Sequence, residues 1–157
     1  MKHIDASTYR IDDSVGYLIR QSGALMRQEL DHQFLEGELT AVQWLTLMRL
    51  RDDPTCSAAL LSRWLHHDSG AFTRVLDQLE AKGFVVRERS HEDRRSVVLR
   101  LTDDGRTAAE AALPRVLNHI NDALHDFTAD EVVQLKTLLN KLIARLDGRG
   151  RRLGSSP

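Results

Sequence analysis

The sequence predicts a mainly α-helical protein with one two-stranded β-hairpin, an α+β fold in the order α-α-α-α-β-β-α-α. Apolar residues recur at helical spacing through most of its 157 residues. The segments 84–89 and 96–101 largely alternate apolar with charged or polar residues, which is typical of strands. Gly83 stands just before the first of these segments, where a glycine commonly ends a helix.

Composition is that of an ordinary globular protein. Hydrophobic residues make up 41% and charged residues 29%, and the net charge is −1, so any nucleic-acid surface must come from local clustering. A single cysteine excludes an intramolecular disulfide and fits a reducing compartment. No apolar run approaches the roughly 20 residues that span a bilayer, and residues 1–10 lack the apolar segment of a secretory signal. We therefore expect a cytoplasmic protein.

The first two helices are predicted by their caps and apolar periodicity. Residues 12–14 offer three N-cap candidates for a long helix that runs to about residue 33. Thr40 and Gln43 form a capping-box pattern at the start of a second helix. That helix must stop before Pro54, because the residue preceding a proline disfavours helical geometry.

A third and a fourth helix precede the hairpin. The third is expected to begin at Ser57. After a short turn, Asp68 or Ser69 caps the fourth, which ends at Gly83. Its inward-facing stripe has i, i+3, i+4, i+7 spacing and consists of Phe72, Val75, Leu76 and Leu79. The segment between the strands, 90–95, has no Asn-Gly or Gly-Gly turn, which predicts an open, charged tip rather than a tight turn.

The last two helices follow the hairpin. Thr102 caps a fifth helix that we expect to reach about Phe127, with a kink at Pro114. A second capping box, Thr128 with Glu131, begins the sixth helix. The first, fifth and sixth helices carry more apolar residues than a small helical core needs, which indicates a dimer interface.

The third and fourth helices resemble in outline a helix-turn-helix, whose second helix enters the major groove of DNA. The exposed face of the fourth helix is small or hydrogen-bonding, and we predict that it contacts DNA: Ser69, Gly70, Ala71, Thr73, Arg74 and Gln78. Small residues let the backbone approach phosphates, and the planar guanidinium of Arg74 can bind guanine O6 and N7 together. A solvated helix face with one incidental arginine is the alternative.

The hairpin favours the DNA-binding interpretation. Its strands and tip carry five arginines against three acidic residues. Arg94 and Arg95 lie at the tip, and a protruding arginine suits the negative potential of a narrow minor groove. Asp93 is interpreted as a brace that holds one of these arginines through a charge-assisted hydrogen bond. The alternative for Asp93 is a surface ion pair that contributes little. Helix, turn, helix and hairpin together predict a winged helix-turn-helix.

The segment LDQLEAKGFVVRERSHEDRRSVVLRLTDDG and the preceding LLSRWL resemble the MarR family of winged helix-turn-helix regulators, and its SlyA-like members in particular. The shared features are the L-x-x-L-E-x-K-G helix end, the D-x-R tip and the V-x-L-x-LT-x-x-G run. The resemblance places Arg74 at the base-contacting arginine of the family, Arg95 at the minor-groove arginine and Asp93 at its bracing acid. It implies a homodimer on a pseudo-palindromic operator, usually a repressor, that is relieved by a small aromatic, anionic ligand.

This interpretation gives one MarR-like domain over 1–157. Within it we expect a winged helix-turn-helix lobe at 40–102, dimerisation helices at 12–36 and 103–147, and a flexible polar tail at 148–157. The expected partners are double-stranded DNA, a second copy of the chain and a phenolic or aromatic carboxylate effector. No membrane, cofactor or metal is expected.

Several other residues are candidates for sensing an effector, an oxidant or a metal. Leu18, Trp44 and Met48 are weak candidates for an effector pocket, although core packing is the favoured role of both Trp44 and Trp64. Cys56 at a helix start leaves an oxidant sensor open, and the seven histidines, without recognisable ligand spacing, leave a metal sensor open. A helical interaction module without DNA binding is a further alternative. The sequence contains no Gly-rich phosphate loop, G-x-S-x-G or H-E-x-x-H motif, so an enzyme is not expected.

Overall fold

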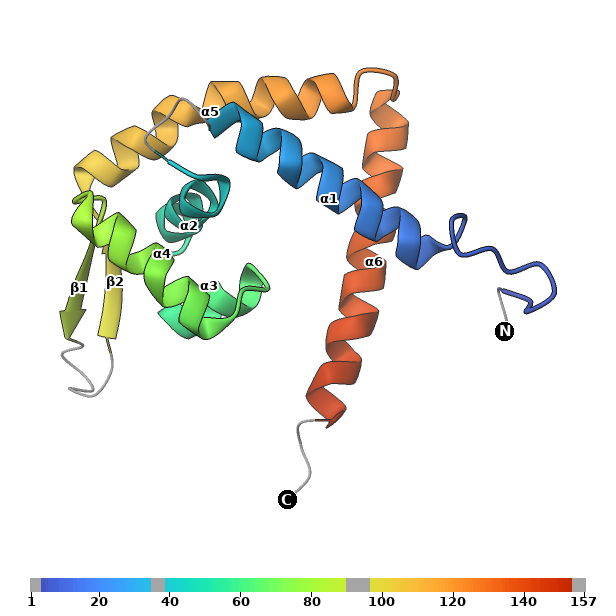
Figure 1. Ribbon diagram of the computed structural model, residues 1–157, viewed down its shortest axis with the longest axis horizontal. Coiled ribbons are helices and arrows are strands. Elements are labelled where there is room, and N and C mark those ends of the chain that lie inside the picture. Colours follow the sequence, from blue (N-terminus) through green and yellow to red (C-terminus); the bar gives the residue numbers. More distant parts are fainter. Residues whose placement is uncertain (1–3, 35–38, 90–96, 154–157) are drawn as a thin grey trace. The chain divides into compact units, whose positions relative to one another are not determined.

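The computed structural model describes residues 4–34, 39–89 and 97–153 and has the predicted order of six helices and two strands (Figure 1). The elements are α1 (Val15–Phe34), α2 (Ala41–Asp52), α3 (Ala58–Trp64), α4 (Ser69–Ala81), β1 (Val85–Arg89), β2 (Val97–Leu101), α5 (Asp103–Ala123) and α6 (Ala129–Leu153). The chain divides into two compact units, residues 1–119 and 120–157. Among the described residues, no helix combines the length and apolar character that crossing a bilayer requires.

Local capping chemistry accounts for most helix starts. The Thr40 hydroxyl accepts the Gln43 N–H at 3.3 Å, and the Gln43 side chain accepts the Thr40 N–H at 3.1 Å, which confirms the capping box of α2. The Ser57 hydroxyl accepts the Leu60 N–H at the start of α3. Asp68 rather than Ser69 is the N-cap of α4.

Helix α2 lies at the centre of the first unit, where it contacts α1, α4 and β2. The most completely buried side chains of this core come from α2, α3, α4, α5 and the sheet: Leu47, Leu50, Leu61, Phe72, Leu79, Val85, Leu99 and Val116. Trp44 is 7% exposed and donates its indole N–H to the Ala109 carbonyl of α5 at 3.0 Å. Its ring also packs against Phe34 at the end of α1, with ring centroids 6.1 Å apart.

The two strands form an antiparallel ladder that runs from Val85 opposite Leu101 to Arg89 opposite Val97. Val85 and Leu99 lie in the core, and alternation turns Arg100, the residue after Leu99, to the opposite, exposed face. Arg87 lies opposite Leu99 and shares its face, but it is exposed. The predicted open tip, residues 90–95, lies outside the described residues.

The junction between α4, the sheet and α5 explains three residues of the sequence motif. Gly83 has φ +72°, the left-handed conformation predicted for the residue after the α4 cap. The Thr102 hydroxyl donates to the Gly83 carbonyl at 2.7 Å and accepts the Gly105 N–H at 3.0 Å. A Cβ atom at Gly105 would lie 2.1 Å from the Phe84 carbonyl oxygen, so only glycine fits where α5 begins.

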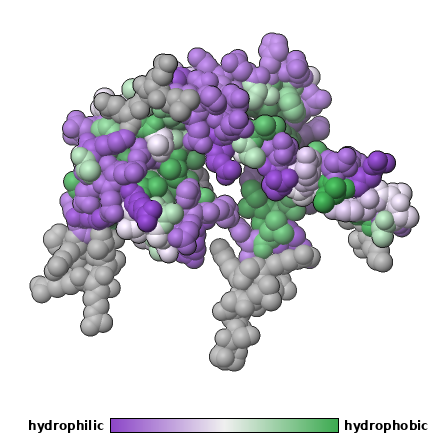
Figure 2. All heavy atoms as spheres, in the orientation of Figure 1, coloured by the Kyte–Doolittle hydropathy of each residue, from purple (hydrophilic) through white to green (hydrophobic). Residues whose placement is uncertain are grey.

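The second unit consists of the end of α5 and helix α6. Thr128 and Glu131 form the predicted capping box, in which the Thr128 backbone N–H and hydroxyl donate to the Glu131 carboxylate. These hydrogen bonds lower the pKa of Glu131. Figure 2 shows hydrophobic surface on α6. The exposed large apolar residues of this helix are Val133, Leu135, Leu138, Leu139, Ile143 and Leu146.

Three sequence expectations differ from the structure. Helix α5 ends at Ala123 rather than near Phe127, because a turn precedes the α6 cap. Helix α6 continues to Leu153 through the segment expected to be a tail, since isolated glycines weaken a helix without ending it. Trp64 was expected in the core but is 49% exposed, and the Arg49 guanidinium lies 5.8 Å from its ring centroid.

Candidate nucleic-acid interface

The start of α4 is held by the carboxylate of Asp68. Its Oδ1 accepts the N–H groups of Gly70 at 2.9 Å and Ala71 at 3.2 Å. A Cβ atom at Gly70 would lie 3.2 Å from the same oxygen, so the small residue predicted there leaves room for the cap. The backbone N–H groups of Gly70 and Ala71 are therefore already hydrogen-bonded. Their small side chains can let the backbone come close to DNA phosphates, but these two N–H groups are not free to bind them.

The turn that leads into α4 is rigid. The Ser62 hydroxyl donates to the His67 carbonyl at 2.8 Å, and the His67 N–H donates to the Ser62 carbonyl at 3.0 Å. His66 between them has φ +50°, a conformation that non-glycine residues rarely adopt. This reciprocal pair of hydrogen bonds joins the end of α3 to the turn before α4.

Arg74 is the predicted base-reading residue, and the structure leaves its side chain exposed on α4. In the described part of the chain, its guanidinium has no ion-pair or hydrogen-bond partner. Thr73, beside it, is also exposed, and its hydroxyl donates to the Ser69 carbonyl at 2.9 Å within the same helix. Thr73 can therefore offer DNA its methyl group and an acceptor lone pair, whereas Arg74 offers all its donors.

The acidic residues of α4 are paired with the hairpin. Arg87 of β1 lies 2.6 Å from Asp77 and 3.2 Å from Glu80. Arg100 of β2 lies 2.6 Å from Glu88 of β1. Two of the five arginines that the sequence assigned to DNA attraction are thus committed to internal pairs. The Arg87 pairs join the hairpin to α4 and partly offset the charges of Asp77 and Glu80, whereas the Arg100–Glu88 pair lies within the hairpin.

Gln78 lies one helical turn after Arg74 and is exposed. Its Oε1 accepts a hydrogen bond of 2.9 Å from Nε2 of Gln43, a residue of α2 that is only 2% exposed. From the sequence, Gln43 is expected only as half of a capping box. Its position in an apolar helix was a sign of burial, and a buried amide needs partners for both its oxygen and its nitrogen.

The wing residues Arg94, Arg95 and Asp93 lie outside the described residues, so the predicted minor-groove contact and its brace stay predictions. Strands β1 and β2 extend from α4 and α5 toward this segment (Figure 1).

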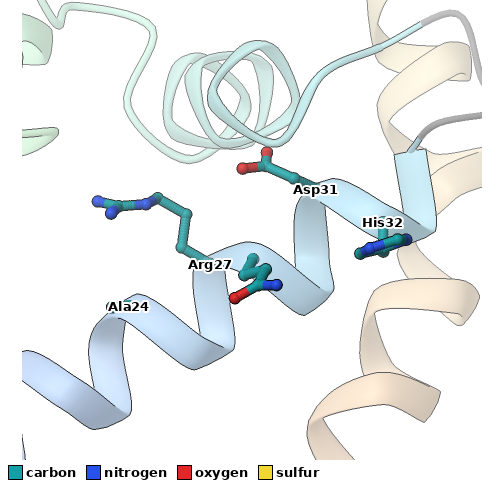
Figure 3. Close-up of a pocket in the computed structure, with 5 residues that line it drawn as sticks. Ala24, Arg27, Asp31 and His32 are labelled. Atoms are coloured by element: carbon teal, nitrogen blue, oxygen red, sulfur yellow. The ribbon is translucent and has the colours of Figure 1, made fainter.

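The three predicted effector residues differ in exposure. Leu18 is 48% exposed on α1, Trp44 is buried against α5, and Met48 is partly buried on α2. A hollow of about 440 Å³ along α1 is lined by Ala24, Arg27, Gln28, Asp31 and His32 (Figure 3). All five come from α1, and the close-up shows the Arg27 and Asp31 side chains extending away from the helix.

Cys56 and the histidines are the candidate sensing residues. Cys56 is buried, 2% exposed, beside the start of α3. Within residues 4–34, 39–89 and 97–153, no group of three His, Cys, Asp or Glu side chains could hold a metal ion.

Comparisons with known proteins find relatives of this chain. The profile of the MarR family matches residues 39–97, which include α2, α3, α4 and β1. The multiple antibiotic resistance protein MarR of Salmonella typhimurium is 35% identical over 107 residues, which are 68% of this chain and 74% of that protein. These relatives are transcriptional regulators and not enzymes. Membership of the SlyA-like subgroup stays a prediction.

Solved structures agree with the fold. A structure of BpsR from Bordetella bronchiseptica, concerned with regulation of its DNA binding by 6-hydroxynicotinic acid, has a TM-score of 0.76 and 26% identity. It covers 85% of this chain and 96% of that one. A mutant MarR from E. coli complexed with operator DNA has a TM-score of 0.74 and 29% identity, covering 85% and 99%. Taken with the capped helix α4, its exposed Arg74 and the attached two-stranded hairpin, these similarities establish that the chain belongs to the MarR family of transcriptional regulators.

Proposed function

We propose that this protein binds a specific operator sequence as a homodimer and acts in the cytoplasm as a ligand-relieved repressor. The observation that carries the DNA contact is the exposed Arg74 guanidinium, which lacks an internal partner within the described residues. An arginine in this state can bind guanine O6 and N7 without first breaking an ion pair. The neighbouring Asp77 and Glu80 are paired with Arg87, which reduces their repulsion of phosphates.

Dimerisation is supported by the unpartnered apolar residues of the terminal helices. On α6, Val133, Leu138 and Ile143 are each more than half exposed. Exposed apolar residues at this density are unfavourable in a monomer and suit an interface between copies. In a dimer, the two α4 helices would enter successive major grooves about 34–36 Å apart, and the operator would be pseudo-palindromic.

The proposed effector is a small aromatic carboxylate. Support comes from the family resemblance and from the similarity to BpsR, whose DNA binding is regulated by 6-hydroxynicotinic acid. Leu18 and Met48 remain the accessible members of the proposed pocket. Trp44 is buried and its N–H donates to the Ala109 carbonyl, so it can contribute only part of its ring to the pocket.

The test is fluorescence anisotropy with a labelled duplex from the DNA upstream of the protein's own gene, against a shuffled duplex of equal composition. Specific binding should exceed binding to the shuffled duplex by about 10³-fold or more at physiological salt. Phenolic and aromatic carboxylates are then added to the complex, and an effector should release the specific duplex. Equal affinity for both duplexes would overturn sequence-specific regulation, and no binding to either duplex would favour an interaction module without DNA binding.

A further inference from the structure

The side chain of Gln43 has one allowed orientation. Its Oε1 accepts the Thr40 N–H at 3.1 Å and the Lys82 ammonium at 3.1 Å. A backbone N–H and an ammonium are donors only, so the amide oxygen must face both of them. The Nε2 group therefore faces α4, where it donates to Gln78 Oε1 at 2.9 Å. Reversing the amide would set donors against donors in a site that is 2% exposed.

This arrangement also fixes the amide of Gln78. Its oxygen is engaged by Gln43, so its own Nε2, with two N–H groups, is the polar end left for the exposed side of α4. Glutamine that reads adenine uses its oxygen and its nitrogen together. Because its oxygen is turned toward Gln43, Gln78 presents its two N–H groups outward as donors.

We propose that Gln43 is a positioning residue that sets Gln78 as a hydrogen-bond donor toward DNA. Gln78 then selects an acceptor, which is either a base edge such as guanine O6 or N7 or thymine O4, or a phosphate oxygen. The inference rests on the proposed function, in which α4 faces the major groove, and it adds the direction of one hydrogen bond at that surface.

The decisive variant is Gln43→Glu, which has nearly the same shape. The introduced carboxylate can still accept from Thr40 and Lys82, but it has no donor for Gln78. The Gln78 amide should therefore turn, donate to the carboxylate and present its oxygen outward. Gln28→Glu adds the same charge on an exposed part of α1 and serves as the matched control.

Binding sites are selected from a randomised operator library with wild type, Gln43→Glu, and each of them combined with Gln78→Ala. If Gln78 meets a base, Gln43→Glu should shift the preference at one half-site position roughly tenfold toward adenine or cytosine, which offer amino donors. The Gln28→Glu variant should show no shift. The Gln78→Ala background should abolish the shift, which a general distortion of α4 would not do.

If Gln78 meets a phosphate, Gln43→Glu should leave base preference unchanged and weaken all sites together. A methylphosphonate at the contacted position should then weaken wild type but not Gln78→Ala. The inference is overturned if Gln43→Glu binds as wild type does, or if its effect persists without Gln78.

Gln43→Met covers the case in which the charged variant does not fold, because the apolar side chain leaves the Gln78 amide free to rotate. Discrimination at that position should then fall if Gln78 meets a base, or all sites should weaken together if it meets a phosphate. A Gln43→Met variant that binds as wild type does would also overturn the inference. Failure of the proposed function is distinguishable, since wild type itself would then show no selected sequence.

Discussion

Replacing Arg74 by alanine tests the main DNA contact with little structural side effect. The guanidinium is exposed and has no partner among the described residues, so its removal leaves no buried group unsatisfied. A good bidentate arginine contact to guanine contributes about 1–3 kcal/mol of discrimination. That range corresponds to about a 5- to 150-fold loss in affinity for each contact. A dimer places two such contacts on the operator, so the loss of free energy should approximately double.

The matched control for Arg74→Ala is Arg106→Ala. Arg106 is exposed in the first turn of α5 and carries the same charge, but it lies outside the predicted DNA-binding set. Both variants are titrated against the operator and a shuffled duplex at several salt concentrations. Arg74→Ala should lower operator affinity more than shuffled affinity, whereas Arg106→Ala should change both little and together. Equal weakening of both duplexes by Arg74→Ala would refute base reading and leave only a phosphate contact.

Three further changes test the framework around the interface. Gly105→Ala forces a Cβ atom against the Phe84 carbonyl oxygen and should lower the free energy of unfolding, measured in urea, by about 1–3 kcal/mol or more. The control Gly23→Ala, with open space around its Cβ, should raise it by up to about 1 kcal/mol. Glu131 has a lowered pKa, so its cap stabilises α6 at neutral pH and is lost as pH falls; Glu131→Gln should lose less helical circular dichroism on acidification than wild type. Trp44→Phe removes a buried hydrogen bond and should cost about 0.5–1.5 kcal/mol in urea unfolding.

Features that depend on neighbours in sequence could be predicted closely. Capping boxes need only residues three apart, so the starts of α2 and α6 followed from Thr40 with Gln43 and from Thr128 with Glu131. The left-handed Gly83 followed from the same local logic. The order of helices and strands, and the pairing of the hairpin, follow from periodicity and short connections.

Features that depend on distant contacts could not be predicted. Gln43 meets Gln78 across 35 positions of sequence, and no periodic pattern announces such a pair. From the sequence alone, Arg87 looks like a cation that is available to DNA, because its ion pair with Asp77 is visible only in the structure. Trp64 fits an apolar stripe, yet it lies one helical turn after the exposed Leu60, whereas Leu61 is the α3 residue that enters the core.

The electrostatics of the interface follow from pairing rather than from total charge. A net charge of −1 argues against DNA binding if charges are simply summed. In the structure, Arg87 partly offsets the charges of Asp77 and Glu80 and joins the hairpin to α4, whereas the Arg74 guanidinium on the same helix has no partner among the described residues. Exposed charges act on one another mainly within about one Debye length, roughly 8–10 Å. A chain that is slightly acidic overall can therefore still present an unpaired guanidinium to DNA.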